Sequence, residues 1–264
     1  MPFEITPDDH GGYAVTRDGH PQSYVHLDDP GLLVYEYVQH LAMALDALPP
    51  GPLRVTHVGG AGLSLARYVE HCRPGSPQIV LEPDETLTAA VRDRLPLPRR
   101  HRIRVRATDG VAGMAALRDG SADMVVVDAF DQGRVPGELL GANFALELAR
   151  VLASGGVAAL NTCDEPGLRH ARTVAATLAG PLPYLGLIAL KEVLSGRRFG
   201  NVVILASQRP LAETTLSRRA ASATFPTTFL GTAATRRWLS GAAGFGPTGI
   251  RSPVPPEPGV WRRR

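Results

Sequence analysis

Cysteine is scarce in this sequence. The 264 residues include two, Cys72 and Cys163, which lie far apart with no CxxC motif and no paired histidine spacing. Disulfide frameworks and zinc sites need more closely spaced ligands. We therefore expect no disulfide framework and no metal site, and this cysteine usage fits a reducing compartment.

Long hydrophobic runs are also missing. No apolar run approaches the ~20 residues that a membrane-spanning helix needs, and YLGLIAL at 184–190 has the length of a buried strand. The N-terminal stretch MPFEITPDDHGG contains acids and lacks the apolar core of a signal peptide. The sequence predicts a soluble, cytoplasmic protein with no membrane partner.

Neither sign of charge dominates. Lys and Arg total 28 against 25 acids, which leaves a net charge of +3, and Lys191 is the sole lysine. One dense basic segment, RRHRIRVR at 99–106, alternates Ile103 and Val105 with arginines. This alternation is typical of an amphipathic strand with a solvated face, so we expect no nucleic-acid partner.

The first 50 residues differ in pattern from the rest. Residues 13–27 alternate around Asp18–Gly19, a hairpin turn in which glycine tolerates positive φ. Residues 32–48 are apolar at helical spacing, and PPGP at 49–52 ends that helix. We predict a small N-terminal β-hairpin and helix region over residues 1–50.

Residues 51–210 alternate strand and helix patterns. This order predicts an α/β fold with a doubly wound parallel sheet covered on both faces. Two later runs, at 184–191 and 200–206, bring the expected methyltransferase-like (Rossmann-like) sheet to seven strands, with the last pair antiparallel. The other expected strands are 53–59, 77–83, 102–107, 123–129 and 156–162, with helices near 62–72, 84–94, 110–118, 138–153 and 166–179.

The pattern weakens over residues 211–264. ATRRWLSGAA at 234–243 predicts a last helix, which Trp238 would anchor onto the body. The stretch that follows is rich in Gly, Pro and Arg, a composition typical of an extended or disordered tail. We therefore expect a C-terminal helix and tail here.

A glycine-rich loop follows the first strand of the α/β region. In VTHVGGAGLSLARYV, Gly59, Gly60 and Gly62 allow the backbone around Ala61 to turn sharply and approach a ligand. The glycine spacing differs from the GxGxxG of dinucleotide-binding folds. We therefore predict a nucleoside site for an adenosyl-sulfonium ligand.

Acids end the next two strands. Glu82 lies about 20 residues further on, where a carboxylate can accept hydrogen bonds from ribose hydroxyls. Asp109–Gly110 ends the third strand, where a side chain and a backbone N–H can bind an adenine edge. Each acid alone has a plainer explanation as a helix cap or an exposed loop residue. Together, at the carboxyl ends of strands, they favour a nucleoside site.

Two further carboxylates, Asp128 and Asp131, follow the apolar run of the fourth strand. One of the two carboxylates could act as general base for an attacking amine, because an aliphatic amine (pKa ~10.4) is cationic at neutral pH. The other could hold a second ammonium group of the substrate. The alternative is that Asp128 caps a turn and Asp131 is an ordinary loop residue.

These motifs resemble those of the spermidine synthase-like family, the polyamine aminopropyltransferases, over about residues 13–207. RDGHPQ keeps Asp18–Gly19 and Gln22 of the family's LDGxxQ hairpin, and YEYVQH keeps Glu36 and His40 of its YHExxxH helix. The resemblance implies that Gln22, Glu36 and His40 lie at the substrate. The resemblance also covers the glycine loop VGGAG, the acid Glu82, the pair Asp109–Gly110 and the stretch VVVDAFDQ.

The resemblance also implies an activity. It would be aminopropyl transfer from decarboxylated S-adenosylmethionine to a small-molecule amine or polyamine, with Asp128 as the catalytic base and Asp131 as the amine ligand. Family members commonly form dimers or tetramers through the N-terminal region. A homodimer or tetramer is therefore expected.

Some family positions differ here and leave alternatives open. Ala61 replaces the Asp that holds the aminopropyl amine, and Gln132 replaces a Pro. LKEVLSGRRFGNVVILAS occupies the place of the family's PTYPSGxW segment. A second possibility is an S-adenosylmethionine-dependent methyltransferase, whose loop N–H groups at Gly60 to Gly62 would bind the methionine carboxylate. A third is a non-catalytic nucleoside-binding protein.

Overall fold

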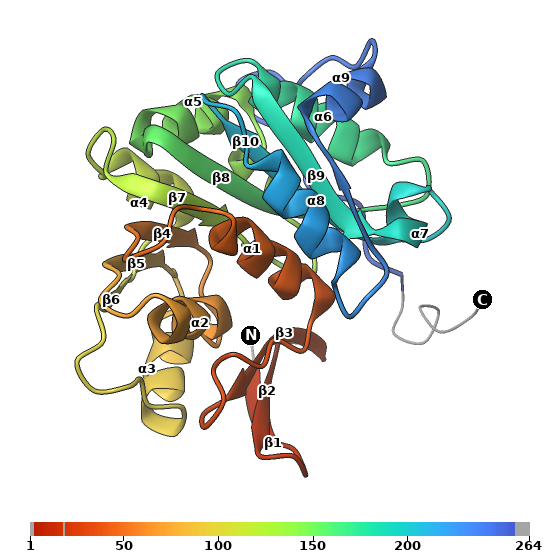
Figure 1. Cartoon of the computed structure of the whole chain (residues 1–264). Helices are drawn as coiled ribbons and strands as arrows, with labels where there is room; N and C mark the ends of the chain where they lie inside the picture. The colour runs from red at the N-terminus through yellow and green to blue at the C-terminus, as the bar shows by residue number, and fades with distance from the viewer. Residues whose placement is uncertain (1–2, 18, 257–264) are drawn as a thin grey trace.

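A computed structural model describes residues 3–17 and 19–256 (Figure 1). Asp18, expected in the hairpin turn, lies outside the described residues, whereas Gly19 has the positive φ of +76° that the turn needs. The elements run, in chain order, β1 (Phe3–Pro7), β2 (Gly12–Arg17), β3 (His20–His26), α1 (Glu36–Asp46), β4 (Val55–Val58), α2 (Ser64–Cys72), β5 (Gln78–Leu81), α3 (Glu85–Arg94), β6 (Ile103–Arg106), α4 (Gly110–Ala115), β7 (Ala122–Val127), η1 (Gly137–Leu139), α5 (Ala142–Val151), β8 (Leu152–Asp164), α6 (Arg169–Ala179), β9 (Tyr184–Leu190), α7 (Lys191–Leu194), β10 (Gly200–Ser207), α8 (Glu213–Ala221), β11 (Thr227–Leu230) and α9 (Thr232–Leu239).

The central sheet confirms the predicted doubly wound α/β architecture. Within the described residues its strand order is β6-β5-β4-β7-β8-β10-β9-β11. Strands β4 to β8 pair in parallel, whereas β10 is antiparallel to both β8 and β9, as predicted for the last pair. The direction of winding reverses between β4 and β7, and open α/β sheets bind ligands at such a point.

The sequence predicted seven strands in the central sheet, one fewer than the described residues form. In the described chain an eighth strand, β11, pairs antiparallel with the edge of β9. It has only four residues, TTFL, and each is partly buried. A strand this short shows little alternation, and it forms because the exposed edge of β9 offers free hydrogen-bonding groups.

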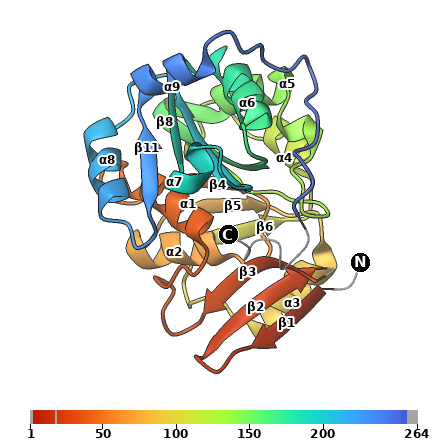
Figure 2. The same cartoon turned by 90° about the vertical axis from the view of Figure 1, so that its right-hand side faces the viewer.

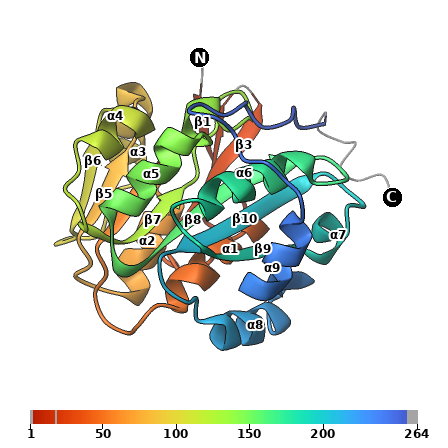
Figure 3. The same ribbon diagram turned by 90° about the horizontal axis from the view of Figure 1, so that it is seen from above.

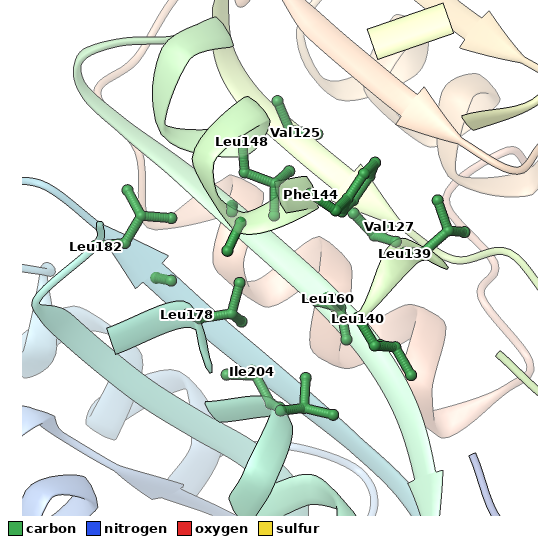
Figure 4. Packing of buried hydrophobic residues seen from close by; sticks show 14 of the residues in the cluster. Val125, Val127, Leu139, Leu140, Phe144, Leu148, Leu160, Leu178, Leu182 and Ile204 are labelled. Atoms are coloured by element: carbon green, nitrogen blue, oxygen red, sulfur yellow. The ribbon is translucent and has the colours of Figure 1, made fainter. Parts of the chain in front are cut away.

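Both faces of the sheet are covered, which explains the continuous apolar run of β7. Met124 and Val126 pack toward α1, whereas Val125 and Val127 pack toward α5 and α6. Figure 4 shows the latter two valines beside Phe144 and Leu148 of α5. In Figure 3 the helices α5 and α6 lie on the side of the sheet opposite α1.

The N-terminal strands form a separate antiparallel sheet, and β1 joins the expected hairpin of β2 and β3. Helix α1 instead packs on the central sheet with α8. The division of the chain at residues 50 and 210 stays a prediction. In the described residues no helix combines the length and apolar composition needed to cross a bilayer.

The C-terminal segment is extended, one of the two states that its composition allowed, and residues 245–256 lie against the body (Figure 2). The carbonyls of Gly246 and Pro247 accept hydrogen bonds from the first backbone N–H groups of α5. A Cβ added at Gly141 would lie 2.4 Å from the carbonyl oxygen of Pro247. We call residues 245–256 the strap, and its close approach requires glycine at position 141.

A single methyl group at Gly141 should therefore loosen the strap. We expect Gly141→Ala to lower the free energy of unfolding by about 1–3 kcal/mol, as overpacking does, and to speed trypsin cleavage after Arg251. Gly246→Ala is the control, because nothing lies within 4 Å of its added Cβ. Thermal unfolding and timed proteolysis measure both effects, and equal behaviour of the two variants would contradict the packing argument.

Candidate active site

Two cavities meet at the carboxyl ends of β4 and β7 in the described part of the chain. The large cavity, of about 730 Å³, lies among β3, the start of α1 and the ends of β7 and β8. The small cavity, of about 410 Å³, extends past the glycine loop toward the ends of β5 and β6. Residues that line both are Gln22, Gly59, Gly60, Ala61, Asp128 and Phe130.

The glycine loop owes its shape to close backbone contacts. Gly59 has φ +91°, and a Cβ there would lie 2.3 Å from the carbonyl oxygen of Asp128. Ala61 follows in the left-handed region at φ +38°. Gly62 lies beneath the N-terminal sheet and donates its N–H to Ser23 Oγ at 3.0 Å. Of the predicted loop residues, Gly59, Gly60 and Ala61 line the cavities, whereas Gly62 holds the N-terminal sheet in place.

Glu82 ends β5 and lines the small cavity as predicted. Its Oε2 accepts the backbone N–H groups of Gly60 at 3.1 Å and Ala61 at 3.2 Å, and its Oε1 accepts that of Asp84 at 3.0 Å. The carboxylate is therefore fixed by three donors. Loop amides that could bind a ligand's carboxylate already bind this one.

Asp109 and Gly110 also line the small cavity. Asp109 Oδ1 accepts a hydrogen bond from the N–H of Ala112 at 2.9 Å. The residue therefore caps α4, which was the alternative explanation for this acid. An added Cβ at Gly110 would lie 2.4 Å from Val58 Cγ1. The cap fixes the backbone of Asp109 and Gly110 at the cavity wall. It uses Oδ1 of Asp109, so Oδ2 takes no part in the capping hydrogen bond.

Asp128 lies directly after β7, where the two cavities join. It is partly accessible from them, yet desolvation by the surrounding protein raises its pKa to about 6. Asn161 Nδ2 donates to Asp128 Oδ1 at 2.9 Å and partly offsets this rise. Burial and the nearby Asp128 charge also raise the pKa of Tyr37. A carboxyl group with this pKa is suited to proton transfer near neutral pH.

The surroundings of Asp131 differ from those of Asp128. It lines the small cavity and forms an ion pair with Arg251 of the strap, with Oδ2 2.6 Å from the guanidinium. The guanidinium also donates to the backbone carbonyl of Asp131 at 2.8 Å. The predicted ammonium ligand thus already has a cationic partner, which sequence spacing could not reveal because the two residues are 120 positions apart.

The N-terminal candidates separate into two groups. Gln22 lines both cavities, and Glu36 lines the large one near the stacked rings of Tyr35 and Tyr37, whose centroids are 6.0 Å apart. His40 is not among the residues described as lining either cavity. Its Nε2 lies 3.0 Å from Thr227 Oγ1 and burial lowers its pKa to about 4, so it connects α1 to β11.

Several lining residues were missed from the sequence. Asn161 lies near the end of β8, and Asn201 is the second residue of β10, opposite Cys163 of β8. His57 of β4 lies beneath the glycine loop, and its Nε2 is hydrogen-bonded to Gln78 Oε1 at 2.9 Å. A polar residue near the end of an apolar strand could have signalled Asn161. Asn201 gave no such signal, because only the antiparallel course of β10 brings its first residues to this edge.

Comparison with known proteins gives the family context. No family model matches the chain. Curated polyamine aminopropyltransferases from Neisseria meningitidis serogroups A and B are 26% identical to it over 144 residues, 53% of either chain. The chain thus spans about half the length of these relatives. The structure of a probable spermidine synthase from Corynebacterium glutamicum aligns with a TM-score of 0.86 and 25% identity, over 97% of this chain and 95% of that one.

In sequence and in structure the chain is thus similar to polyamine aminopropyltransferases and to a probable spermidine synthase. Human methyltransferase-like protein 13, in complex with SAH, aligns at a TM-score of 0.58 and 20% identity over 80% of this chain and 95% of that one. This second likeness shows the fold alone, and it confirms the predicted methyltransferase-like sheet.

The raised pKa of Asp128 has a consequence for stability. A carboxyl group whose pKa is higher in the folded protein favours folding when protonated, and that contribution is lost as pH rises from about 4 through about 6. We expect Asp128→Asn to raise the free energy of unfolding at pH 7.5 by up to about 2 kcal/mol, with little difference near pH 4.

Thermal unfolding at the two pH values measures this effect. Asp131→Asn is the matched control, because it removes an ion-paired carboxylate and should give no gain. A lower melting temperature of Asp128→Asn at pH 7.5 would show that the carboxylate is not desolvated.

Proposed function

We propose that the protein transfers an aminopropyl group from decarboxylated S-adenosylmethionine to an amine acceptor. The observation that carries this proposal is the position of Asp128, a desolvated carboxyl group at the junction of two cavities. A bimolecular transfer needs two substrates side by side and a base at the point where they meet. The likeness to polyamine aminopropyltransferases supports the same reaction.

The small cavity suits the nucleoside. Its volume of about 410 Å³ lies within the usual range for small-molecule sites. Glu82 supplies a fixed carboxylate for ribose hydroxyls, and Asp109–Gly110 supplies polar groups at the far wall. Glycine at positions 59 and 110 keeps the backbone close to its neighbours, where side chains would clash. A spermidine synthase of similar fold has been crystallised in complex with the transition-state analogue AdoDATO, which supports an adenosyl ligand.

The large cavity would hold the acceptor. Tyr35, Tyr37 and Phe130 provide apolar walls for its methylene groups, and Glu36 and Asp128 provide negative charge for its amine. A neighbouring sulfonium lowers the pKa of that amine through like-charge repulsion. Asp128 can then receive its proton.

The reaction balances with the residues in these places. The lone pair of the amine nitrogen forms a new C–N bond to the propyl carbon beside sulfur. The C–S bond breaks, and its electron pair returns to sulfur, giving neutral methylthioadenosine. The proton lost from nitrogen goes to Asp128, which Asn161 keeps oriented through its hydrogen bond. Positioning supplies most of the rate, because the sulfonium is already a good leaving group.

A second candidate is methyl transfer from S-adenosylmethionine. The observation that favours it is Ala61, which lines both cavities with a methyl group and carries no charge to oppose a methionine carboxylate. The loop N–H groups expected to bind that carboxylate donate instead to Glu82 and Ser23. The acid at this point disfavours a second anion, so aminopropyl transfer remains the better proposal.

The donor preference and one substitution test the proposal. We expect methylthioadenosine release from decarboxylated S-adenosylmethionine with an amine acceptor, and no S-adenosylhomocysteine from S-adenosylmethionine. Asp128→Asn should lower kcat by about 10²–10⁴-fold, the range for loss of a general base. Chromatography of the adenosyl products measures both. Full turnover of Asp128→Asn would remove Asp128 as the base, and preference for the carboxylated donor would favour methyl transfer.

The pH profile tests the environment of the base. We expect kcat/KM to fall below about pH 6 as Asp128 takes up a proton. Asn161→Ala removes a hydrogen bond to the charged form, so the acid limb should move upward, toward neutral pH. Asn201→Ala, a second amide in the large cavity, should leave the limb in place. Unchanged limbs in both variants would show that Asn161 does not stabilise the Asp128 carboxylate.

A further inference from the structure

The large cavity carries opposite charges. Among the described residues that line it, the carboxylates are Asp128 and Glu36, and the guanidinium is Arg198. The other member of the acid pair, Asp131, lines the small cavity and is paired with Arg251. The pairing of Asp131 makes it a poor partner for a second ammonium group, which leaves Asp128 and Glu36 as the carboxylates that an amine can meet in the large cavity.

A polar path leads from the base to this guanidinium. Asp128 bonds to Asn161 of β8, and Asn161 and Cys163 share a face because they are two residues apart on one strand. Asn201 of β10 lies opposite Cys163, so Asn161 and Asn201 are diagonal neighbours about 7–8 Å apart. Arg198 precedes Asn201 by three residues and lines the same cavity.

The charge of Arg198 is only loosely balanced within the described chain. Its Nη1 lies 3.8 Å from Glu192 Oε2, and the Glu192 side chain is 66% exposed. Such exposed pairs contribute little, since water and salt screen them. The Nε of Arg198 donates to the carbonyl of Phe199 at 3.3 Å, which orients the guanidinium. A planar guanidinium in this setting matches a carboxylate.

We propose that the acceptor is an ω-amino acid, a chain with an amine at one end and a carboxylate at the other. This inference rests on the proposed aminopropyl transfer. The amine lies at Asp128 and Glu36, the methylene groups lie against Tyr35 and Tyr37, and the carboxylate binds Arg198 with Asn201 beside it. The reaction stays as described above, and the carboxylate takes no part in the bond changes. Arg198 is thus a specificity-determining residue, because its positive charge would repel the second ammonium group of a diamine.

Matched acceptors test this inference at saturating decarboxylated S-adenosylmethionine. Putrescine is compared with 4-aminobutanoate and cadaverine with 5-aminopentanoate, with methylthioadenosine release as the readout. We expect kcat/KM to be at least tenfold higher for each amino acid than for its diamine. Arg198→Glu should reverse this preference, and Arg198→Gln, which removes charge without adding any, should abolish it and guards against a folding defect in the first variant.

Arg197→Glu is the control, because it makes the same charge change one residue away and Arg197 is not among the residues described as lining the cavity. It should keep the wild-type preference within about twofold. A wild type that prefers diamines, with Arg198→Glu behaving like Arg197→Glu, would overturn the inference while aminopropyl transfer stands. No methylthioadenosine with any acceptor would overturn both.

Discussion

The contact between the backbones of Gly59 and Asp128 is the constraint on which the site depends. Strands β4 and β7 are neighbours in parallel register, with Val58 beside Val127, so both chains leave the sheet at the same point. No side chain fits at position 59, because a Cβ added to Gly59 would lie 2.3 Å from the carbonyl oxygen of Asp128. This proximity brings the glycine loop and the acid together where the two cavities join, which is the arrangement that the proposed two-substrate reaction needs.

The ionised form of Asp128 costs the fold stability at neutral pH, because burial raises the pKa of this carboxyl group. Asp128 is held where solvent hydrates it poorly, and Asn161 supplies the hydrogen bond that limits the rise in its pKa. Buried polar groups persist when they are bonded, and nearby Glu82 is bonded to three backbone donors. The two acids therefore differ in role: Glu82 is fixed by its donors, whereas Asp128 can change its proton occupancy near neutral pH.

Local patterns in the sequence were sufficient to predict seven of the eight strands of the central sheet in the described residues, and the edge at which its glycine loop and acids meet. The loop at Gly59, Glu82 and Asp128 follow their strands directly, so strand order alone brings them together. His40 and Asp131 were harder, because their surroundings come from Thr227 and Arg251, far along the chain. No periodicity in the sequence encodes such contacts. The strap was foreseen as extended or disordered, and its docking depends on backbone hydrogen bonds that composition does not reveal.

The pairing of Asp131 with Arg251 also orders events during synthesis. These residues are 120 positions apart, so at 5–20 residues per second the ribosome adds Arg251 about 6–24 s after Asp131. The strands that position Asp128 are complete well before that. During this interval the nascent chain carries the acid pair without its strap cation, and the charge at the edge of the sheet is more negative than in the finished fold. A segment synthesised after these strands thus sets the electrostatics of a site that was shaped earlier.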